Sequence, residues 1–117
     1  MFSLPKSHRI RTRSEYKSTL AKSSKAVRRN LLVKAHKKKE GVMRMGMIVT
    51  KKVGNAVVRN RIKRLLRESF RTLPMSIRQK PFDIVVIARQ GARTSNCQKM
   101  QEQLTSGIHQ LTSLRSR

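Results

Sequence analysis

One amphipathic helix, predicted over Val58–Leu73, constrains this chain more than any other feature. Seven residues fall on one side at the 3.6-residue period, namely Val58, Ile62, Leu65, Leu66, Ser69, Phe70 and Leu73. The opposite side carries Asn60, Lys63, Arg64, Arg67 and Arg71, with Arg59 and Arg61 on its flanks. The chain must therefore cover one side of this helix with a core and meet something anionic on the other.

The charged residues on the positive side of this helix do not pair with opposite charges on the same side. Exposed helix faces commonly mix opposite charges four residues apart, which adds roughly 0.2–0.5 kcal/mol per pair. Here Lys63 precedes Arg67 by four residues, and Arg67 precedes Arg71 by four, so like charges repel. Arginine also presents a planar fork that suits phosphates and stacked bases. The pattern predicts a nucleic-acid-binding face, and a solvated helix face is the alternative.

The charge balance of the whole chain supports a polyanionic partner. Of 117 residues, 29 are Lys or Arg and 5 are Asp or Glu, so the formal net charge is +24. Self-repulsion on this scale opposes compaction unless a partner supplies negative charge. A membrane is a poor candidate, because aromatic residues make up 3%, Trp is absent and no apolar run reaches transmembrane length. Cys97 is the single cysteine, so we expect no intrachain disulfide and a reducing, cytoplasmic location.

Strand patterns surround the basic helix. Residues 30–36 predict a strand followed by a hairpin turn at 37–41, and alternation over 43–50 indicates a half-buried strand. The apolar, β-branched run Phe82–Ala88 is typical of a central strand. With the basic helix between two strands, residues 43–88 form a βαβ unit.

Two further helices complete the predicted order α-β-β-α-β-α. A capping box at Thr12–Glu15 begins a helix to about Lys22, with Tyr16 and Leu20 facing inward. Thr94 or Ser95 caps a last helix, whose buried face comprises Cys97, Met100, Leu104, Ile108 and Leu111. We therefore expect a small mixed α/β domain of three or four strands with one core.

Two segments beside the basic helix are candidate contact sites. Gly54 and Asn55 form a tight turn and an N-cap, and the free amides that follow attract phosphate, reinforced by Lys51 and Lys52. A plain capped helix is the alternative interpretation of that turn. Tyr16 and the strand from Asn30 could border a groove for a single RNA strand, although aromatic platforms are few.

Catalytic chemistry by the protein itself is not indicated. His8, His36 and His109 are scattered, and the five acids form no paired carboxylates and no metal-ligand spacing. Three alternatives stay open at this point: a structural ribosomal RNA-binding protein, a DNA-compacting or helix-turn-helix protein, and a protein-only nuclease. The last is the weakest, because it needs a carboxylate cluster.

Four segments resemble the bacterial ribonuclease P protein subunit. The run KKVGNAVVRNRIKRLLRESFR is similar to the family signature, with Arg59, Asn60 and Arg61 as its central triplet. The segments LPKSHRIRTRSEY, RMGMIVTKK and FDIVVIARQGA resemble the family's opening, its strand into the signature and its following strand. The resemblance spreads over about 110 residues, so it is more specific than a lone triplet.

The resemblance implies a fold and a function. The fold would be α+β, a two-layer α/β sandwich with a small, mostly antiparallel sheet, three helices and a left-handed βαβ crossover of the ribosomal protein S5 domain 2-like fold. The right-handed rule for such crossovers alone would predict the other hand. Family members bind the catalytic RNA of ribonuclease P and the 5′ leader of precursor tRNA, and the RNA subunit with Mg2+ removes the leader. One protein would bind one RNA.

The resemblance also assigns roles to residues. The catalytic RNA would be held by Lys51, Lys52, Asn55, Arg59, Asn60, Arg61, Lys63, Arg64 and Arg67. The leader would be bordered by Arg11, Tyr16, Asn30 and Lys34. Members often have aromatic residues on the cleft strand, where this chain has Asn30, Val33 and Lys34, so charge and hydrogen bonds would replace stacking.

The chain is expected to form a single RNA-binding domain over residues 1–117. Residues 1–10 would form a basic arm, for which an organellar transit peptide is the alternative, and 112–117 a frayed tail.

Overall fold

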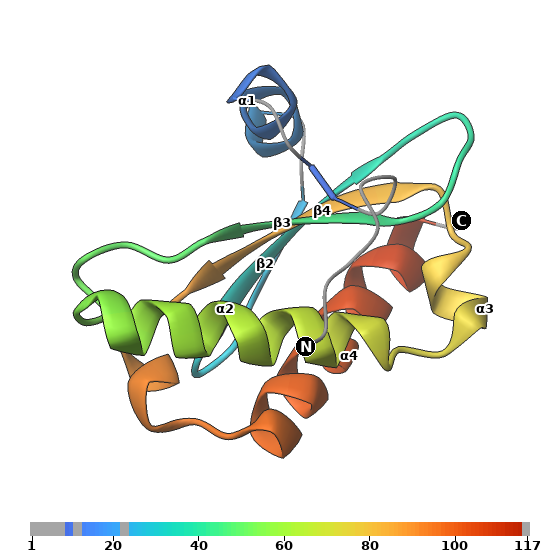
Figure 1. The fold of residues 1–117 in the computed structure, drawn as a ribbon. Coiled ribbons are helices and arrows are strands. Elements are labelled where there is room, and N and C mark those ends of the chain that lie inside the picture. The colour runs from blue at the N-terminus through green and yellow to red at the C-terminus, as the bar shows by residue number, and fades with distance from the viewer. Residues whose placement is uncertain (1–8, 11–12, 22–23, 116–117) are drawn as a thin grey trace.

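The computed structural model describes residues 9–10, 13–21 and 24–115, which form a four-stranded sheet with helices on both faces (Figure 1). In chain order the elements are α1 (Arg13–Ala21), β1 (Ser24–Val27), β2 (Leu31–Lys37), β3 (Arg44–Ile48), α2 (Ala56–Arg71), α3 (Met75–Arg78), β4 (Phe82–Ala88), the 3₁₀ helix η2 (Gln90–Thr94) and α4 (Cys97–Arg115). The α+β class is confirmed. Elements β1, α3 and η2 are additions to the predicted order, and each is too short to show a hydrophobic period.

Strand β4 lies inside the sheet, whose order is β1-β2-β4-β3. Strand β2 pairs antiparallel with β1 and β4, whereas β3 pairs parallel with β4. The sheet is therefore mixed, and Phe82–Ala88 is an inner strand as predicted. The hairpin predicted at 37–41 is wrong, because β4 lies between β2 and β3. A polar, Gly-containing loop marks a chain reversal, but it does not determine which strands pair.

The two faces of the sheet are covered differently. Helices α2 and α4 lie together on one face, and α1 lies on the other (Figure 1). The core between the sheet and the two long helices contains Val33, Met45, Ile84, Val86, Ile62, Leu66, Phe70, Met100, Leu104 and Ile108, each 2% exposed or less. This burial confirms the apolar stripes predicted for both helices, and it leaves the outer face of each helix to solvent or a partner.

Asparagine caps begin both long helices. The Asn55 side chain accepts a hydrogen bond from the amide of Val58 at 3.0 Å, as predicted. The Asn96 side chain accepts one from the amide of Lys99 at 2.9 Å. The cap predicted at Thr94 or Ser95 is therefore wrong, because those two residues end η2.

Gly107 lies inside α4, where helix propensity alone implies a loss of about 1 kcal/mol relative to Ala. A Cβ atom there would lie 3.0 Å from Cγ2 of Val33 on β2. The glycine therefore allows the helix to pack close against the sheet.

The two ends of the chain are described in part. Residues 1–8 of the expected basic arm lie outside the described residues. Arg9 forms a parallel bridge with Met45, and the amide of Ile10 donates to the Met45 carbonyl at 3.2 Å. The end of the arm therefore lies along the outer edge of β3.

Helix α4 continues to Arg115, into the segment 112–117 that was expected to fray, and Thr112 is buried. The single-domain organisation over 1–117 stays a prediction. So does the left-handed sense of the crossover from β3 through α2 to β4.

Candidate nucleic-acid interface

The outer side of α2 is a continuous positive surface. Asn60 and Arg64 are exposed, whereas Lys63 and Arg67 are half-buried. Burial of Ile62, Leu65, Leu66, Ser69 and Phe70 fixes the rotation of the helix, so these polar side chains point away from the core. Helix α2 carries six basic residues and one acid, Glu68. This surface, which we call the α2 face, attracts polyanions without any rearrangement of the fold.

The loop before α2 presents a second positive feature. Val53 is 2% exposed and anchors the loop, while Lys51 and Lys52 are exposed beside it. A Cβ atom on Gly54 would lie 2.8 Å from the Val58 side chain, so a glycine is needed for this close turn into the helix. Two lysines therefore stand next to the positive end of the helix dipole, an arrangement that favours phosphate.

Two predicted RNA-binding arginines also have contacts within the protein. The Arg61 guanidinium donates to the Ser95 carbonyl at 2.8 Å, which ties α2 to the segment between η2 and α4. The Arg59 Nε atom is buried without a hydrogen-bond partner in the described part of the chain. Substitution of either residue therefore changes more than RNA contact, and Arg64 and Arg67 are cleaner probes of the α2 face.

Tyr16 and Lys34 lie on the opposite face of the sheet. The Tyr16 hydroxyl accepts a hydrogen bond from the amide of Met47 at 3.1 Å. A Cβ atom on Gly46 would lie 2.6 Å from the Tyr16 ring, so this glycine makes room for the ring against β3. Lys34 is half-buried on β2 and is in register with Val85, which is itself in register with Gly46. Two of the predicted leader contacts thus share the α1 side of the sheet.

The other two predicted leader contacts are not brought to that place. Arg11 lies outside the described residues. Asn30 is 5% exposed, and its amide nitrogen donates to the Ser95 hydroxyl at 2.9 Å. Its backbone amide donates to the side chain of Gln103 on α4 at 2.8 Å. Asn30 therefore lies between β2, η2 and α4, away from the surface that Tyr16 and Lys34 share.

The buried carboxylate of Asp83, near the beginning of β4, forms ion pairs with two basic residues. The Asp83 carboxylate lies 2.9 Å from the Lys38 ammonium and 2.7 Å from the Arg44 guanidinium. Burial acts to raise the pKa of Asp83, but hydrogen bonds and charges from Arg44 and Lys38 outweigh it and hold the pKa below its ordinary value. The sequence did not indicate this cluster, because Asp83 is 39 or more residues from both of its partners and is brought to them by the pairing of the strands.

The described residues contain neither a cluster of metal-ligating side chains nor a helix that could span a membrane. No three side chains of His, Cys, Asp or Glu among those residues gather closely enough to hold a metal ion. No helix there has the length and apolar character that a bilayer crossing requires.

The fold and the α2 face define a class of protein: a small α+β nucleic-acid-binding domain whose parallel strands flank one basic helix. Comparison with known proteins narrows that class. The model of the family described as Ribonuclease P matches residues 4–112. The chain belongs to this family and is a protein component of the ribonuclease P holoenzyme.

Relatives and solved structures agree with this assignment. The ribonuclease P protein component of Oceanobacillus iheyensis is 39% identical over 103 residues, which cover 87% of this chain and 84% of that one. The ribonuclease P protein of Staphylococcus aureus superposes with a TM-score of 0.74 at 31% identity, covering 92% of this chain and 94% of that one. That of Thermotoga maritima also gives 0.74, at 28% identity, covering 84% and 92%. Family membership favours the ribonuclease P assignment over the ribosomal, DNA-binding and protein-only nuclease alternatives.

Proposed function

We propose that this protein binds the catalytic RNA of ribonuclease P and the 5′ leader of precursor tRNA, and so assists RNA-catalysed endonucleolytic removal of the leader. The observation that carries the proposal is the α2 face, six basic residues and one acid on a helix whose other side is buried in the core. The protein would contribute binding and positioning, and the RNA subunit would contribute the chemistry.

The catalytic RNA would lie along the α2 face and the loop before it. The proposed contacts are Lys51, Lys52, Asn55, Arg59, Asn60, Arg61, Lys63, Arg64 and Arg67. Of these, Asn55 uses its side chain for the helix cap, so it would act through the amides that it orients. Each phosphate neutralised adds about 0.7–0.9 to the slope of log affinity against log salt, so binding should weaken steeply as salt rises.

The leader would pass over the α1 side of the sheet, beside Tyr16 and Lys34. The Tyr16 ring is packed on Gly46 and its hydroxyl is engaged by Met47. A strand passing there would therefore rely on the Lys34 charge together with one face of the ring. We expect Lys34→Ala to weaken leader affinity while Tyr16→Phe leaves it nearly unchanged. Unchanged leader affinity in Lys34→Ala, with complete loss in Tyr16→Ala, would contradict this view.

The remaining proposals concern partners and location. Mg2+ would be held mainly by the RNA subunit, since the described residues offer no cluster of metal ligands and the protein surface is strongly cationic. One protein would bind one RNA, in the cytoplasm.

The test is single-turnover cleavage of a precursor tRNA with a leader of several nucleotides, catalysed by a bacterial ribonuclease P RNA at low Mg2+. We expect strong stimulation by the protein and its loss in the double variant Arg64→Ala, Arg67→Ala. The matched control is Lys37→Ala, Lys39→Ala, which removes the same charge from exposed residues at the end of β2. Tight RNA binding without stimulation would refute the proposed role, and equal loss in both variants would refute the assignment to the α2 face.

A further inference from the structure

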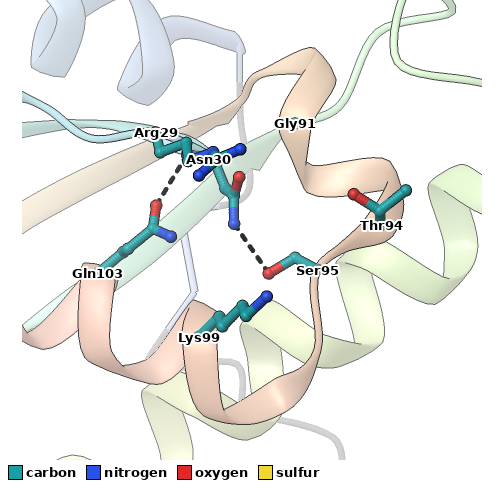
Figure 2. Close-up of a pocket in the computed structure, with 7 residues that line it drawn as sticks. All are labelled: Arg29, Asn30, Gly91, Thr94, Ser95, Lys99 and Gln103. Atoms are coloured by element: carbon teal, nitrogen blue, oxygen red, sulfur yellow. Dashed lines mark hydrogen bonds between the residues drawn. The ribbon is translucent and has the colours of Figure 1, made fainter.

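A pocket of about 290 Å³ lies between the β1–β2 connection, η2 and the first turns of α4 (Figure 2). Its size is at the small end of ligand pockets, which run from about 300 to 1,000 Å³. Apart from Asn30, none of its lining residues belongs to the surfaces assigned above. Figure 1 shows η2 at the end of the molecule where α2 begins.

Asn30 forms a rigid wall of this pocket. Its side-chain nitrogen donates to Ser95, its backbone amide donates to Gln103, and its carbonyl accepts from the amide of Arg89 at 2.9 Å. A Cβ atom on Gly91 would lie 2.7 Å from Oδ1 of Asn30, so this wall requires a glycine opposite. In Figure 2 the side-chain nitrogen points to Ser95 and the oxygen lies on the side of Gly91.

The Oδ1 atom of Asn30 receives no hydrogen bond from any residue that the structure describes. The residue as a whole is only 5% exposed. An acceptor in so enclosed a place is stabilised when a donor reaches it. The pocket therefore offers a fixed acceptor to a ligand that carries a donor.

The rest of the lining suits an anion. Arg29 and Lys99 line the pocket from opposite sides, and Thr94 contributes a hydroxyl that is turned toward Asn30 in Figure 2. The amide of Gln103 accepts from Asn30 through its oxygen, which leaves its nitrogen as a donor. None of the described residues that line the pocket is acidic. Cationic and neutral donors thus surround one acceptor in an enclosed position.

A nucleotide has this combination of groups. Its phosphate accepts hydrogen bonds and carries negative charge, while its 2′-hydroxyl or the amino group of its base donates.

A hydrogen bond also links one wall of the pocket to α2. Arg61 on α2 donates to the carbonyl of Ser95, the residue whose hydroxyl accepts from Asn30. An RNA strand that extends from the first half of α2 to the pocket would therefore pass this polar contact. The exposed residues Arg89 and Arg93 lie on the same η2 segment and add positive charge.

We propose that this pocket binds a single unpaired ribonucleotide of a bound RNA strand, with its phosphate between Arg29 and Lys99 and its hydroxyl or base amino group on Asn30. The proposal rests on the proposed RNA-binding function, and it adds a subsite outside the α2 face. A free mononucleotide offers the same chemistry, so the test must distinguish the two sources.

The informative substitution is Gln103→Glu. It keeps an oxygen for the Asn30 amide but replaces a donor by negative charge inside the pocket. Its matched control is Gln110→Glu on the same helix, where the side-chain oxygen accepts from Arg28 at 2.7 Å, a bond that a carboxylate preserves. Lys99→Ala and Thr94→Val test the pocket without touching the Asn30 contacts, should Gln103→Glu unfold the protein.

Affinity of the full-length protein for ribonuclease P RNA and for precursor tRNA is measured across a salt series. We expect Gln103→Glu to weaken binding of at least one RNA about tenfold, and Lys99→Ala to lower the salt slope by about 0.7–0.9, with Gln110→Glu within about twofold of wild type. Unchanged affinity and slope in Gln103→Glu, Lys99→Ala and Thr94→Val would overturn the pocket while leaving the α2 face intact. The double variant Arg64→Ala, Arg67→Ala tests the α2 face and is expected to lose RNA binding. If that variant still bound RNA as well as wild type, the proposed function would be refuted, whatever the result for the pocket.

The source of the nucleotide is resolved by following the amide resonance of Gly91 by NMR. RNA is expected to shift this resonance, and adenosine monophosphate or inorganic phosphate is expected to do so only weakly. Saturation by adenosine monophosphate that RNA does not displace would assign the pocket to a free nucleotide and overturn the proposal.

Discussion

Helices α2 and α4 are alike on the inside and different on the outside. Both begin at an asparagine cap, and both bury an apolar stripe against the same face of the sheet. Helix α2 carries six basic residues and one acid, whereas the longer α4 carries two basic residues and one acid. Packing against the core therefore determines the residue types on the inner face of each helix. The residue types on the outer face depend on what that face contacts.

The contrast indicates where part of the +24 net charge of the chain is used. Self-repulsion of that charge opposes folding. Eight of the 29 basic residues lie on α2 and the adjoining loop, where they form one side that a polyanion neutralises. The middle of α4 carries uncharged groups such as the half-buried Thr105 and the exposed Gln110, so we expect this part of the helix, unlike its first turns, to stay clear of the RNA.

The largest expected effect concerns the buried apolar faces of α2 and α4. Leu66 on α2 and Leu104 on α4 are both fully buried, so Leu66→Ala and Leu104→Ala should each lower the free energy of unfolding by about 2–5 kcal/mol. Urea denaturation followed by circular dichroism measures both. Val57→Ala is the control, since Val57 is 76% exposed, and should cost less than about 0.5 kcal/mol. A cost below about 1 kcal/mol for only one of the two leucines would show that the helices do not contribute alike to the core.

The second prediction concerns the outer faces at equal net charge. Arg64→Gln with Arg67→Gln on α2, and His109→Glu with Gln110→Glu on α4, each lower the net charge by about two at pH 7. The α2 pair should weaken RNA affinity on the order of 100-fold and lower the salt slope by about 1.4–1.8, because two phosphate contacts are lost. The α4 pair should change affinity by less than about threefold. Filter binding or fluorescence anisotropy at several salt concentrations provides both quantities, and equal losses would remove the distinction between the faces.

The contrast also explains which features could be predicted from the sequence. The stripe of α2 and the strand Phe82–Ala88 were predicted correctly because their signals are local: a 3.6-residue period and a continuous apolar run. The cap of α4 was misassigned because Thr94, Ser95 and Asn96 are all competent caps. The choice depends on Asn30, 65 residues away, which binds the Ser95 side chain.

The candidate sites also differ in whether their residues are close together in the sequence. The α2 face was predicted because its residues share one helix, whereas the pocket was missed because its walls come from three separate segments. Asn30 was assigned to the leader through the family resemblance, as part of the strand predicted over residues 30–36. Its burial between η2 and α4 depends on tertiary contacts that no period in the sequence reports.

A third prediction separates charges that hold the fold from those that bind. Asp83→Asn removes the carboxylate that Lys38 and Arg44 share and should lower the free energy of unfolding at pH 7 by about 2 kcal/mol. Since the folded-state pKa of Asp83 lies below the unfolded value, its stabilisation is complete above about pH 5 and is lost as the pH falls through the folded-state pKa. Stability curves of wild type and variant should converge only when the pH has fallen below the folded-state pKa of Asp83, which lies under its ordinary value. A stability difference that persists below that pH would contradict the assignment of this stabilisation to the Asp83 carboxylate.

The smallest expected effect compares the two caps. Asn55→Ala and Asn96→Ala each leave one helix amide without its acceptor, and each should cost about 1 kcal/mol of stability. Their effects on RNA affinity should differ in size, because the amides beyond Asn55 lie between Lys51, Lys52 and the α2 face, whereas the first two turns of α4 beyond Asn96 carry one lysine and one acid. Thermal unfolding supplies the stability term, and RNA titration well below the melting temperature supplies the binding term. Substitution with Asp restores either cap, and Asn55→Asp should regain stability while weakening RNA binding, since its carboxylate would repel phosphate at that end. Equal affinity in Asn55→Asp and wild type would show that RNA does not approach the beginning of α2.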